Sequence, residues 1–148
     1  MDSGKKYVAI EAEAKDWEEA LTICGDALIS KDCIGREFVT ACIKREQEFP
    51  TGLPTTIPVA IPHAASNEVK TTSVCVLRLK NPVTFNRMDD SSQTIEARIV
   101  FNLAIKGSSE HIDFLQKLIA FVMDEEKVKK CLELSIEDIP AYLEETII

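Results

Sequence analysis

Two histidines are the side chains of this 148-residue chain best suited to nucleophilic or acid–base chemistry near neutral pH. His63 stands directly behind Pro62 in the stretch AIPHAAS, residues 60–66. Because a proline fixes its own φ and restricts the residue before it, this stretch places the imidazole on a stiff backbone. A stiff mount suits a nucleophile that must meet a reacting atom in one orientation. The residues alone leave a second interpretation open, in which the imidazole only hydrogen-bonds to backbone at a strand end.

The second histidine, His111, is expected in the first turn of a helix that Ser108 or Ser109 caps. Leu115 and Leu118 follow at i+4 and i+7, so the imidazole is expected on the buried face. The N-terminus of a helix offers N–H groups to an anion and disfavours a protonated imidazole. His111 and Ser109 are therefore candidates for an anion site, and a satisfied histidine at the edge of the core is the alternative.

A third candidate group lies at the end of an expected helix. Arg45 precedes the sequence FPTG at residues 49–52. An arginine fork suits two phosphate oxygens, and the hydroxyl of Thr51 and the backbone of Gly52 can supply further donors. We expect Arg45, Thr51 and Gly52 to bind a phosphate-like oxyanion. A solvated surface arginine is the competing interpretation.

Composition and motif inventory exclude several classes of function. Lys and Arg number 17 and Asp and Glu 25, which gives a net charge of −8 without a basic run and argues against nucleic acid or anionic membrane as a partner. CxxC, HxxxH and HExxH motifs are missing, the five glycines are scattered, and no GxSxG elbow occurs. We therefore expect neither a metal nor a bound nucleotide or other cofactor.

Size and cysteine usage predict one compact domain in a reducing compartment. The chain is long enough to bury a core without disulfides. Its five cysteines are an odd number, widely spaced and mostly among apolar neighbours, as buried thiols of a cytoplasmic protein are. Neither a membrane-spanning apolar run nor a signal peptide is found. A free-standing cytoplasmic protein is expected.

Hydrophobic periodicity predicts strands and helices in mixed order. Strands are expected at residues 7–13, 59–61, 72–79 and 95–105, and helices at 17–29, 37–47, from about 109, at 125–132 and at 136–145. The apolar face of the third helix is expected to comprise Ile112, Leu115, Leu118, Ile119 and Val122. This order predicts a mixed sheet with helices packed on it, in the α/β or α+β class.

Two stretches together carry a family resemblance. KREQEFPTGL at residues 44–53, followed by VAIPHA at 59–64, resembles the enzyme IIA domain of the bacterial phosphoenolpyruvate-dependent sugar phosphotransferase system (PTS), in its fructose and mannitol family. The resemblance runs from about residue 7 to 146. The combination of RE, FPTG and AIPH at these separations is far more specific than any piece alone. REQEFPTGL and the later NPVTFNRMDD, residues 81–90, look most like the galactitol-specific branch.

The resemblance implies a fold and a set of roles. It implies a single three-layer α/β/α domain over residues 1–148. It implies that His63 accepts a phosphoryl group from the carrier protein HPr and passes it to a cysteine on a IIB domain, whose membrane partner is IIC. Arg45 matches the arginine that contacts the phosphoryl group in the family. His111 lies where the fructose and mannitol branches have a second active-site histidine, which the galactitol branch does not require.

Three functions stay open on the sequence. The first is a carrier for the uptake of galactitol or a related polyol, and the second is a regulatory module of the nitrogen-related IIA type. An enzyme that uses His63 and His111 as acid and base ranks below both. For docking of partners, Leu53, Ile57 and Val59 are candidates for an apolar rim, with ordinary loop packing as the favoured alternative.

Overall fold

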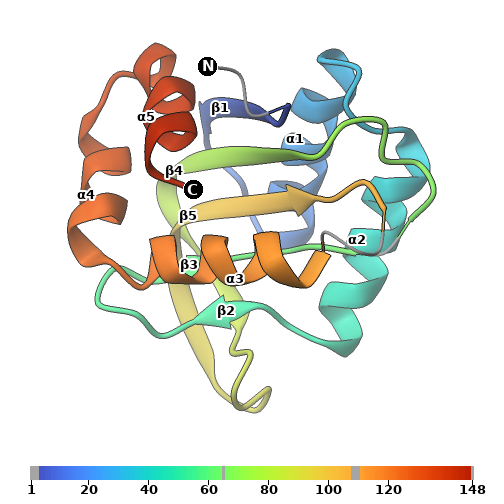
Figure 1. Ribbon diagram of the computed structural model, residues 1–148. Coiled ribbons are helices and arrows are strands. Elements are labelled where there is room, and N and C mark those ends of the chain that lie inside the picture. The colour runs from blue at the N-terminus through green and yellow to red at the C-terminus, as the bar shows by residue number, and fades with distance from the viewer. Residues whose placement is uncertain (1–3, 65, 108–110, 148) are drawn as a thin grey trace.

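The computed structural model describes residues 4–64, 66–107 and 111–147, and in this part of the chain it shows a five-stranded mixed sheet between two layers of helices (Figure 1). The strands are β1 (Lys6–Ala12), β2 (Gly52–Leu53), β3 (Val59–Ala60), β4 (Ser73–Asn86) and β5 (Thr94–Ala104). The helices are α1 (Trp17–Ser30), α2 (Arg36–Glu48), α3 (His111–Val122), α4 (Glu125–Glu133), the 3₁₀ turn η1 (Ile136–Asp138) and α5 (Ile139–Thr146).

The sheet order is β1-β4-β5-β3-β2. β1 runs parallel to β4 and β3 parallel to β5, whereas β4 with β5 and β2 with β3 are antiparallel. The short strand β3 therefore lies beside the middle of β5, and the chain that leaves β3 continues along β5 as far as His63, which bridges to Leu103. This pairing fixes where Pro62 and His63 stand relative to the sheet.

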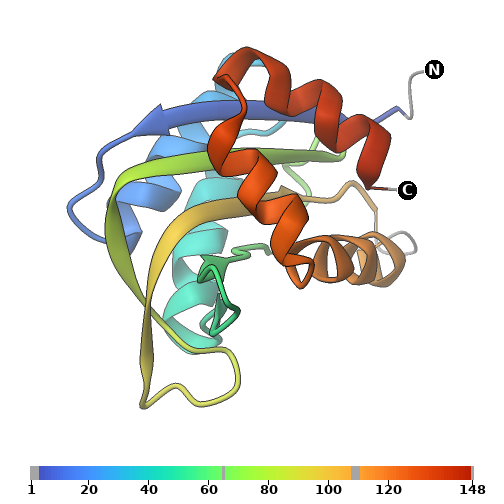
Figure 2. The same cartoon turned by 90° about the vertical axis from the view of Figure 1, so that its left-hand side faces the viewer.

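Buried side chains of the central strands alternate between two cores, as the pleat of a strand requires. Cys75 and Leu77 of β4 face α1 and α2, whereas Val74 and Val76 face α3, α4 and α5. Figure 2 shows the same division, with α1 and α2 on one side of the sheet and the orange and red helices on the other. The expected three-layer α/β/α architecture is confirmed.

The two helical layers bury aromatic and branched side chains against the sheet. Fully or almost fully buried members of the helices are Leu21, Cys24, Leu28, Phe38 and Cys42 on the first face and Phe114, Leu118, Phe121, Val128 and Leu143 on the second. Each large apolar side chain moved out of water contributes roughly 1.5–3 kcal/mol. These cores hold the ends of α2 and α3 against the sheet, where the candidate site lies.

Most expected elements are confirmed to within a residue or two. Asp16 caps α1 as predicted, because its Oδ1 accepts a hydrogen bond of 2.8 Å from the Glu19 N–H. One strand is much longer than expected, since β4 continues to Asn86 past a register shift between Arg78 and Val83. The expected strand ended at residue 79, whereas here Pro82, a residue that central strands rarely contain, falls in the irregular stretch.

One expectation about apolar residues is corrected in part, and another is confirmed. In α3, Ile112 is exposed, whereas Phe114 and Phe121, which were left out of the expected apolar face, are buried. Leu118 and Val122 are buried and Leu115 and Ile119 half-buried, as expected. The buried face is therefore shifted toward the two rings, which bury more area than Ile112 would. Val59 is buried and Leu53 and Ile57 are half-buried in the second core, so their favoured interpretation as ordinary loop packing is confirmed.

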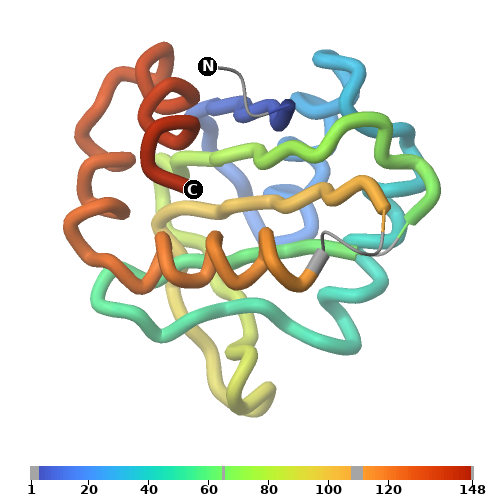
Figure 3. The backbone as a smooth tube through the Cα atoms, in the orientation of Figure 1, coloured from blue at the N-terminus to red at the C-terminus, as the bar shows by residue number. Residues whose placement is uncertain are grey.

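The extended β4 and β5 form a hairpin whose tip projects beyond the rest of the sheet (Figure 3). The tip returns to the body of the protein at one point, where the Met88 N–H donates to the carbonyl oxygen of Gly52 over 2.8 Å. Arg87 also forms a bridge with Gly52. The tip is therefore tied to the turn that follows α2.

Candidate active site

A pocket of about 530 Å³ lies where the end of α2, the end of β3, the hairpin tip and α3 meet. Its polar lining residues include His63 and Arg45, so the structure brings these two predicted residues together. The pocket is lined by Arg45, Glu48, Phe49, Pro50, Thr51, Ile61, His63, Met88, Asp89, Ser91, Leu115 and Ile119. Leu115 and Ile119 belong to α3, the helix that His111 begins.

The imidazole of His63 is held in one tautomer. Its Nδ1 lies 2.7 Å from the carbonyl oxygen of Ile61. A carbonyl oxygen only accepts, so Nδ1 carries the proton and the lone pair of the neutral ring is on Nε2. The side chain is 7% exposed and lines the pocket. The bond to the Ile61 carbonyl oxygen is the kind of backbone contact that the second interpretation of His63 expected. The lone pair on Nε2 is compatible with the first interpretation, in which His63 is a nucleophile.

The backbone under His63 is anchored from β5. The carbonyl oxygen of Pro62 accepts two hydrogen bonds, one from the Leu103 N–H at 2.9 Å and one from the Asn102 amide at 3.1 Å. Asn102 is buried, and its amide also lies 3.7 Å from the Cys42 sulfur. Proline restricts the segment from within, and these bonds fix it from outside. The histidine is therefore mounted on the rigid centre of the sheet.

Arg45 supplies positive charge at the pocket. It lies in the last turn of α2, is exposed, and has its guanidinium 5.3 Å from the centre of the Phe49 ring. Among the described lining residues it is the only Lys or Arg, whereas Glu48 and Asp89 are acidic. A dianionic phosphoryl group in the pocket would therefore depend on Arg45 for charge compensation from this chain.

Both polar hydrogens of Thr51 are directed to Glu46. The Thr51 N–H donates to Oε2 of Glu46 over 2.8 Å, and the Thr51 hydroxyl donates to Oε1 over 2.9 Å. Glu46 is 6% exposed, and burial raises its carboxyl pKa to about 7 against the opposing effect of Thr51 and Arg45. Thr51 lines the pocket as expected. In this structure, however, both of its donors bond to Glu46, so they hold the turn and do not serve a phosphate-like oxyanion in the pocket.

A second cavity of about 380 Å³ adjoins the first at the same turn. Glu46 lines it together with Trp17 of α1 and Asn86 of β4. The two cavities share Glu48, Pro50 and Ser91 in their described linings, whereas Glu46 lines only this one.

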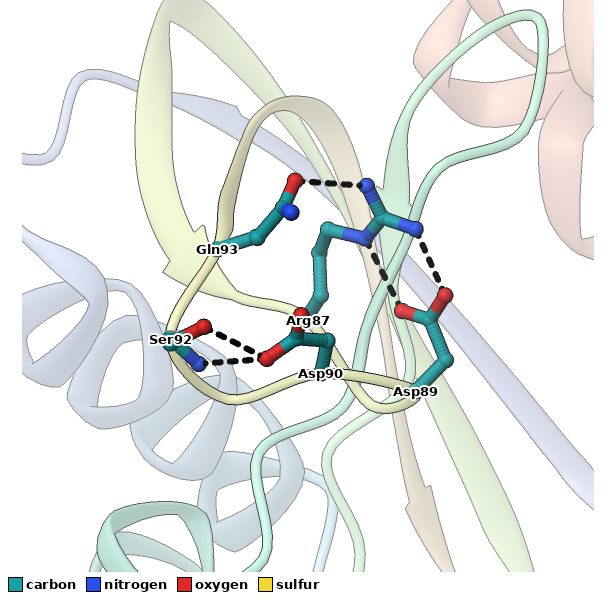
Figure 4. A network of polar contacts seen from close by, with 5 residues as sticks. All are labelled: Arg87, Asp89, Asp90, Ser92 and Gln93. Carbon is teal, nitrogen blue, oxygen red and sulfur yellow. Dashed lines mark hydrogen bonds and ion pairs between the residues drawn. The ribbon is translucent and has the colours of Figure 1, made fainter.

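The hairpin tip contributes Met88, Asp89 and Ser91 to the pocket lining and is cross-linked by its own hydrogen bonds. Figure 4 shows Arg87 gripping both carboxylate oxygens of Asp89, with an Nε–Oδ1 distance of 2.8 Å, and reaching the Gln93 side chain. This guanidinium holds the pKa of the Asp89 carboxyl below its ordinary value. Asp90 accepts from both the N–H and the hydroxyl of Ser92. The tip thus keeps the Asp89 carboxylate, with its charge paired to Arg87, in the pocket wall.

The remaining predicted residues are placed as follows. Gly52 is not among the described residues that line the pocket, and it sits against the hairpin, where a Cβ would come within 2.6 Å of the Asn86 carbonyl oxygen. Glycine is needed there for close approach of two backbones. His111 is the first residue of α3. Ser108 and Ser109 lie outside the described residues.

Metal and thiol chemistry find no support in the described part of the chain. No group of three or more His, Cys, Asp or Glu residues there is placed to hold a metal ion. All five cysteines are free and buried. Burial raises the thiol pKa of Cys42 and Cys131 to about 12. Across the same residues, no helix combines the length and apolarity that crossing a membrane requires.

Sequence reasoning missed the residues that hold the site in place. Asn102 was not singled out, although an amide inside the apolar run IVFNLAI of residues 99–105 is a signal for a buried hydrogen bond. Glu46 was noted only as part of the RE pair. Met88, Asp89 and Ser91 had no local signal, because only the unexpected length of β4 carries them to the pocket.

The fold and the site define a class of protein: an α/β domain whose pocket lining contains a histidine and an arginine. Residues 4–145 match the family described as "Phosphoenolpyruvate-dependent sugar phosphotransferase system, EIIA 2". The mannitol-specific phosphotransferase enzyme IIA component of Halalkalibacterium halodurans is 31% identical over 142 residues, which cover 93% of this chain and 91% of that protein. The chain therefore belongs to this EIIA family, the fructose and mannitol family, and is a phosphoryl carrier and phosphotransferase component of the PTS.

A galactitol-specific relative is similar to this chain in sequence, and two solved structures are similar to it in fold. The galactitol-specific EIIA component of Escherichia coli is 27% identical over 128 residues, covering 86% of this chain and 85% of that one. The crystal structure of IIA mannitol from Escherichia coli superposes with a TM-score of 0.73 at 25% identity, over 93% of this chain and 95% of that one. A structure titled as the complex of enzyme IIA and phosphorylated enzyme IIB for mannitol, from the same organism, gives a TM-score of 0.73 at 23% identity, over 97% and 96%. The identities to the mannitol-specific and galactitol-specific proteins are similar, so they assign the chain to neither branch.

Proposed function

We propose that residues 1–148 act as one cytoplasmic carrier domain that takes a phosphoryl group from phospho-HPr onto Nε2 of His63. The single observation that carries this proposal is the 2.7 Å contact between His63 Nδ1 and the Ile61 carbonyl oxygen, because it leaves the lone pair on Nε2. Family membership makes a phosphoryl group the electrophile.

The reaction is an in-line displacement at phosphorus. The Nε2 lone pair attacks phosphorus as the bond from phosphorus to the donor breaks, and the electrons of that bond leave with the donor. His63 keeps its Nδ1 proton, so the phosphorylated ring gains positive charge, which the Ile61 carbonyl dipole stabilises. In the second step a thiolate of a IIB protein attacks phosphorus, and the electrons of the N–P bond return to Nε2. Positioning and charge compensation supply most of the catalysis in such transfers.

Arg45 is proposed to contact the phosphoryl oxygens. It is the cation that this chain brings to the pocket, within the described residues, and its exposed position lets it reach a group carried by a partner. We also propose that His111, the first residue of α3, and Ser109, two residues earlier in the sequence, add donors. Thr51 and Gly52 are proposed to act through the backbone turn that they build.

The partners are proposed to be HPr as donor and a IIB protein as acceptor, with IIC reached only through IIB. Exposed apolar side chains beside His63 suit protein docking: Phe49 is 59% exposed and Met88 43% exposed, and both line the pocket. For the sugar we propose galactitol or a related polyol, supported by the sequences REQEFPTGL and NPVTFNRMDD and by relatives specific for galactitol and mannitol.

The test uses labelled phosphoenolpyruvate, enzyme I and HPr, followed by mapping of the labelled peptide. We expect acid-labile label on His63 of the wild type and none on His63→Ala, which should remain folded. Label that persists in His63→Ala would refute the assignment. Labelled protein is then offered separately to galactitol-type and mannitol-type IIB proteins. Faster transfer to the galactitol-type cysteine supports the proposed sugar, whereas failure to transfer to any IIB would replace uptake by a regulatory role of the nitrogen-related kind.

A further inference from the structure

The group that links the two halves of the site is a buried carboxylate that no step of the reaction uses. Glu46 follows Arg45 directly in the last turn of α2, but its side chain points away from solvent and accepts both polar hydrogens of Thr51. The two bonds close a ring between the end of the helix and the turn after it. We call this pair of bonds the Glu46–Thr51 clasp.

The clasp continues to the nucleophile through two further hydrogen bonds. The carbonyl oxygen of Thr51 accepts from the Ile61 N–H at 3.3 Å, and the carbonyl oxygen of Ile61 accepts from Nδ1 of His63 at 2.7 Å. The chain of contacts thus runs from Glu46 through Thr51 and Ile61 to the imidazole. Its other end is the helical turn that carries Arg45.

Arg45 depends on the same turn. The Phe49 N–H donates to the Arg45 carbonyl oxygen, and the Phe49 ring lies under the Arg45 guanidinium. Phe49 is two residues before Thr51, so a turn released from Glu46 would displace the ring that supports the guanidinium. The positions of Arg45 and His63, the two groups proposed to act in phosphoryl transfer, therefore both depend on the buried side chain of Glu46.

We infer that Glu46 is a positioning residue, which sets the spacing between the Arg45 guanidinium and His63 Nε2 through its two hydrogen bonds to Thr51. The inference rests on the proposed function. Burying the Glu46 carboxylate, which is 6% exposed, is unfavourable for folding. Its benefit is geometric, because the phosphoryl group then meets Arg45 and His63 at fixed positions. The required property is hydrogen-bonding shape. A glutamine retains it, because its amide oxygen can accept from the Thr51 N–H while its amide N–H donates to the Thr51 hydroxyl oxygen.

The test measures single-turnover transfer from labelled phospho-HPr at increasing donor concentration, which separates the maximal rate from the half-saturating concentration. For Glu46→Ala we expect the maximal rate to fall about 10- to 100-fold with the half-saturating concentration nearly unchanged, since small misplacements at a reacting centre cost factors of this size. Glu46→Gln should recover to within about threefold of the wild type. Glu37→Ala, the same change at an exposed position in the first turn of α2, is the matched control and should behave as wild type.

Thr51→Val removes one of the two bonds at constant shape and keeps the test decisive if Glu46→Ala does not fold. It should slow transfer by an intermediate factor, and the double variant Glu46→Ala/Thr51→Val should be no slower than Glu46→Ala alone, because both remove the same clasp. Additive losses, an unchanged maximal rate in Thr51→Val, or a Glu46→Gln as slow as Glu46→Ala would each overturn the inference. A wild type that takes no label on His63 would instead overturn the proposed function.

Discussion

The Nδ1 nitrogen of His63 lies 2.7 Å from the carbonyl oxygen of Ile61, two residues earlier in the chain. The segment between them contains Pro62, whose own carbonyl oxygen is held from β5 by Asn102 and Leu103. The hydrogen bond to the imidazole is therefore made by backbone that cannot easily move. A histidine placed in this way has its protonation site chosen by the fold.

This relationship predicts the tautomer and the site of phosphorylation. In the neutral unphosphorylated protein, ¹⁵N chemical shifts of His63 should show a protonated Nδ1 and an unprotonated Nε2, because the Ile61 carbonyl oxygen can only accept. After phosphorylation, ³¹P–¹⁵N coupling should place phosphorus on Nε2. A phosphorylated Nδ1, or a proton on Nε2 of the neutral ring, would contradict the arrangement.

Arg45 should contribute to rate far more than to stability. Replacing it by Gln removes the cation of this chain from the pocket, and we expect phosphoryl transfer to slow about 100-fold, the usual effect of deleting a stabilising donor at a transition state. Lys keeps the charge without the two-pronged geometry and should fall between Gln and the wild type. The side chain is exposed, so the free energy of unfolding should change by less than about 0.5 kcal/mol.

The control for Arg45 is on the same helix. Arg36 is exposed and pairs with Asp26 at 2.9 Å, remote from the pocket lining. Arg36→Gln makes the same chemical change in the first turn of α2 and should leave the rate as it is. Equal slowing of both variants would mean that net charge, and not the pocket position of Arg45, governs transfer.

Asn102 should matter for stability and rate together. Asn102→Ala leaves the Pro62 carbonyl oxygen with one of its two donors and opens a small cavity, so we expect a loss of about 1–3 kcal/mol in the free energy of unfolding and slower phosphorylation of His63. Asn81→Ala is the matched control, because Asn81 is exposed and bonds only to the exposed Glu13 among the described contacts. Urea unfolding measures the free energy of unfolding of both variants, and a transfer assay measures their rate of phosphorylation. If Asn81→Ala loses as much stability and rate as Asn102→Ala, Asn102 has no special role.

The core of the fold could be predicted from sequence because it depends on local periodicity. Helices α1 and α2 show the spacing of buried residues that the helical turn requires, and the first half of β5 alternates between exposed and buried residues as a pleat does. Asp16 is an N-cap both in pattern and in fact. β4 could not be bounded, since Pro82 falls in an irregular stretch that only the pairing with β5 defines. The expected buried face of α3 was right for four of its five residues, but it wrongly included Ile112 and left out Phe114 and Phe121.

Some residues of the candidate site could likewise be predicted from sequence, and others could not. His63 and Arg45 were found because their chemistry is visible in residue type and family motif, and the structure brings both to one pocket. Asn102 had a sequence signal, an amide inside an apolar run, but its partner, the carbonyl oxygen of Pro62, lies 40 residues earlier in the chain and could not be named from sequence. The contact of Glu46 with Thr51 is local, but a Glu in the last turn of a helix is usually exposed, so nothing in the sequence pointed to its burial. Asp89 reaches the pocket only because a long hairpin folds back to Gly52.

Asp89 should slow the approach of a phosphorylated partner. Its carboxylate lines the pocket, although Arg87 pairs with it. Neutralising it in Asp89→Asn should raise the association rate with phospho-HPr about twofold at low salt, because one charge at roughly 8 Å in water is worth about 0.5 kcal/mol. The gain should vanish near 0.5 M salt, where the Debye length is only about 4 Å.

Asp90→Asn tests whether this effect is local. Asp90 changes the net charge of the chain by the same amount and stands in the same tip, but it bonds to Ser92 and is not among the described lining residues. It should accelerate association less than Asp89→Asn does. If the two variants respond alike at every salt concentration, the pocket position of Asp89 has no influence.

The buried Glu46 should make stability depend on pH. Burial raises the pKa of its carboxyl from an ordinary value of 4.5 to about 7, so the folded protein holds this proton more tightly than the unfolded chain does. The stabilisation is fully present below about pH 4.5 and is lost as the pH rises through 7, by an amount on the order of 3 kcal/mol. Glu46→Gln does not titrate and should lack this fall. Urea unfolding of both proteins at pH 5 and pH 8 isolates the effect, because the contributions of other groups cancel in the difference. If the difference in the free energy of unfolding between the wild type and Glu46→Gln is the same at pH 5 and pH 8, Glu46 has its ordinary pKa in the folded protein.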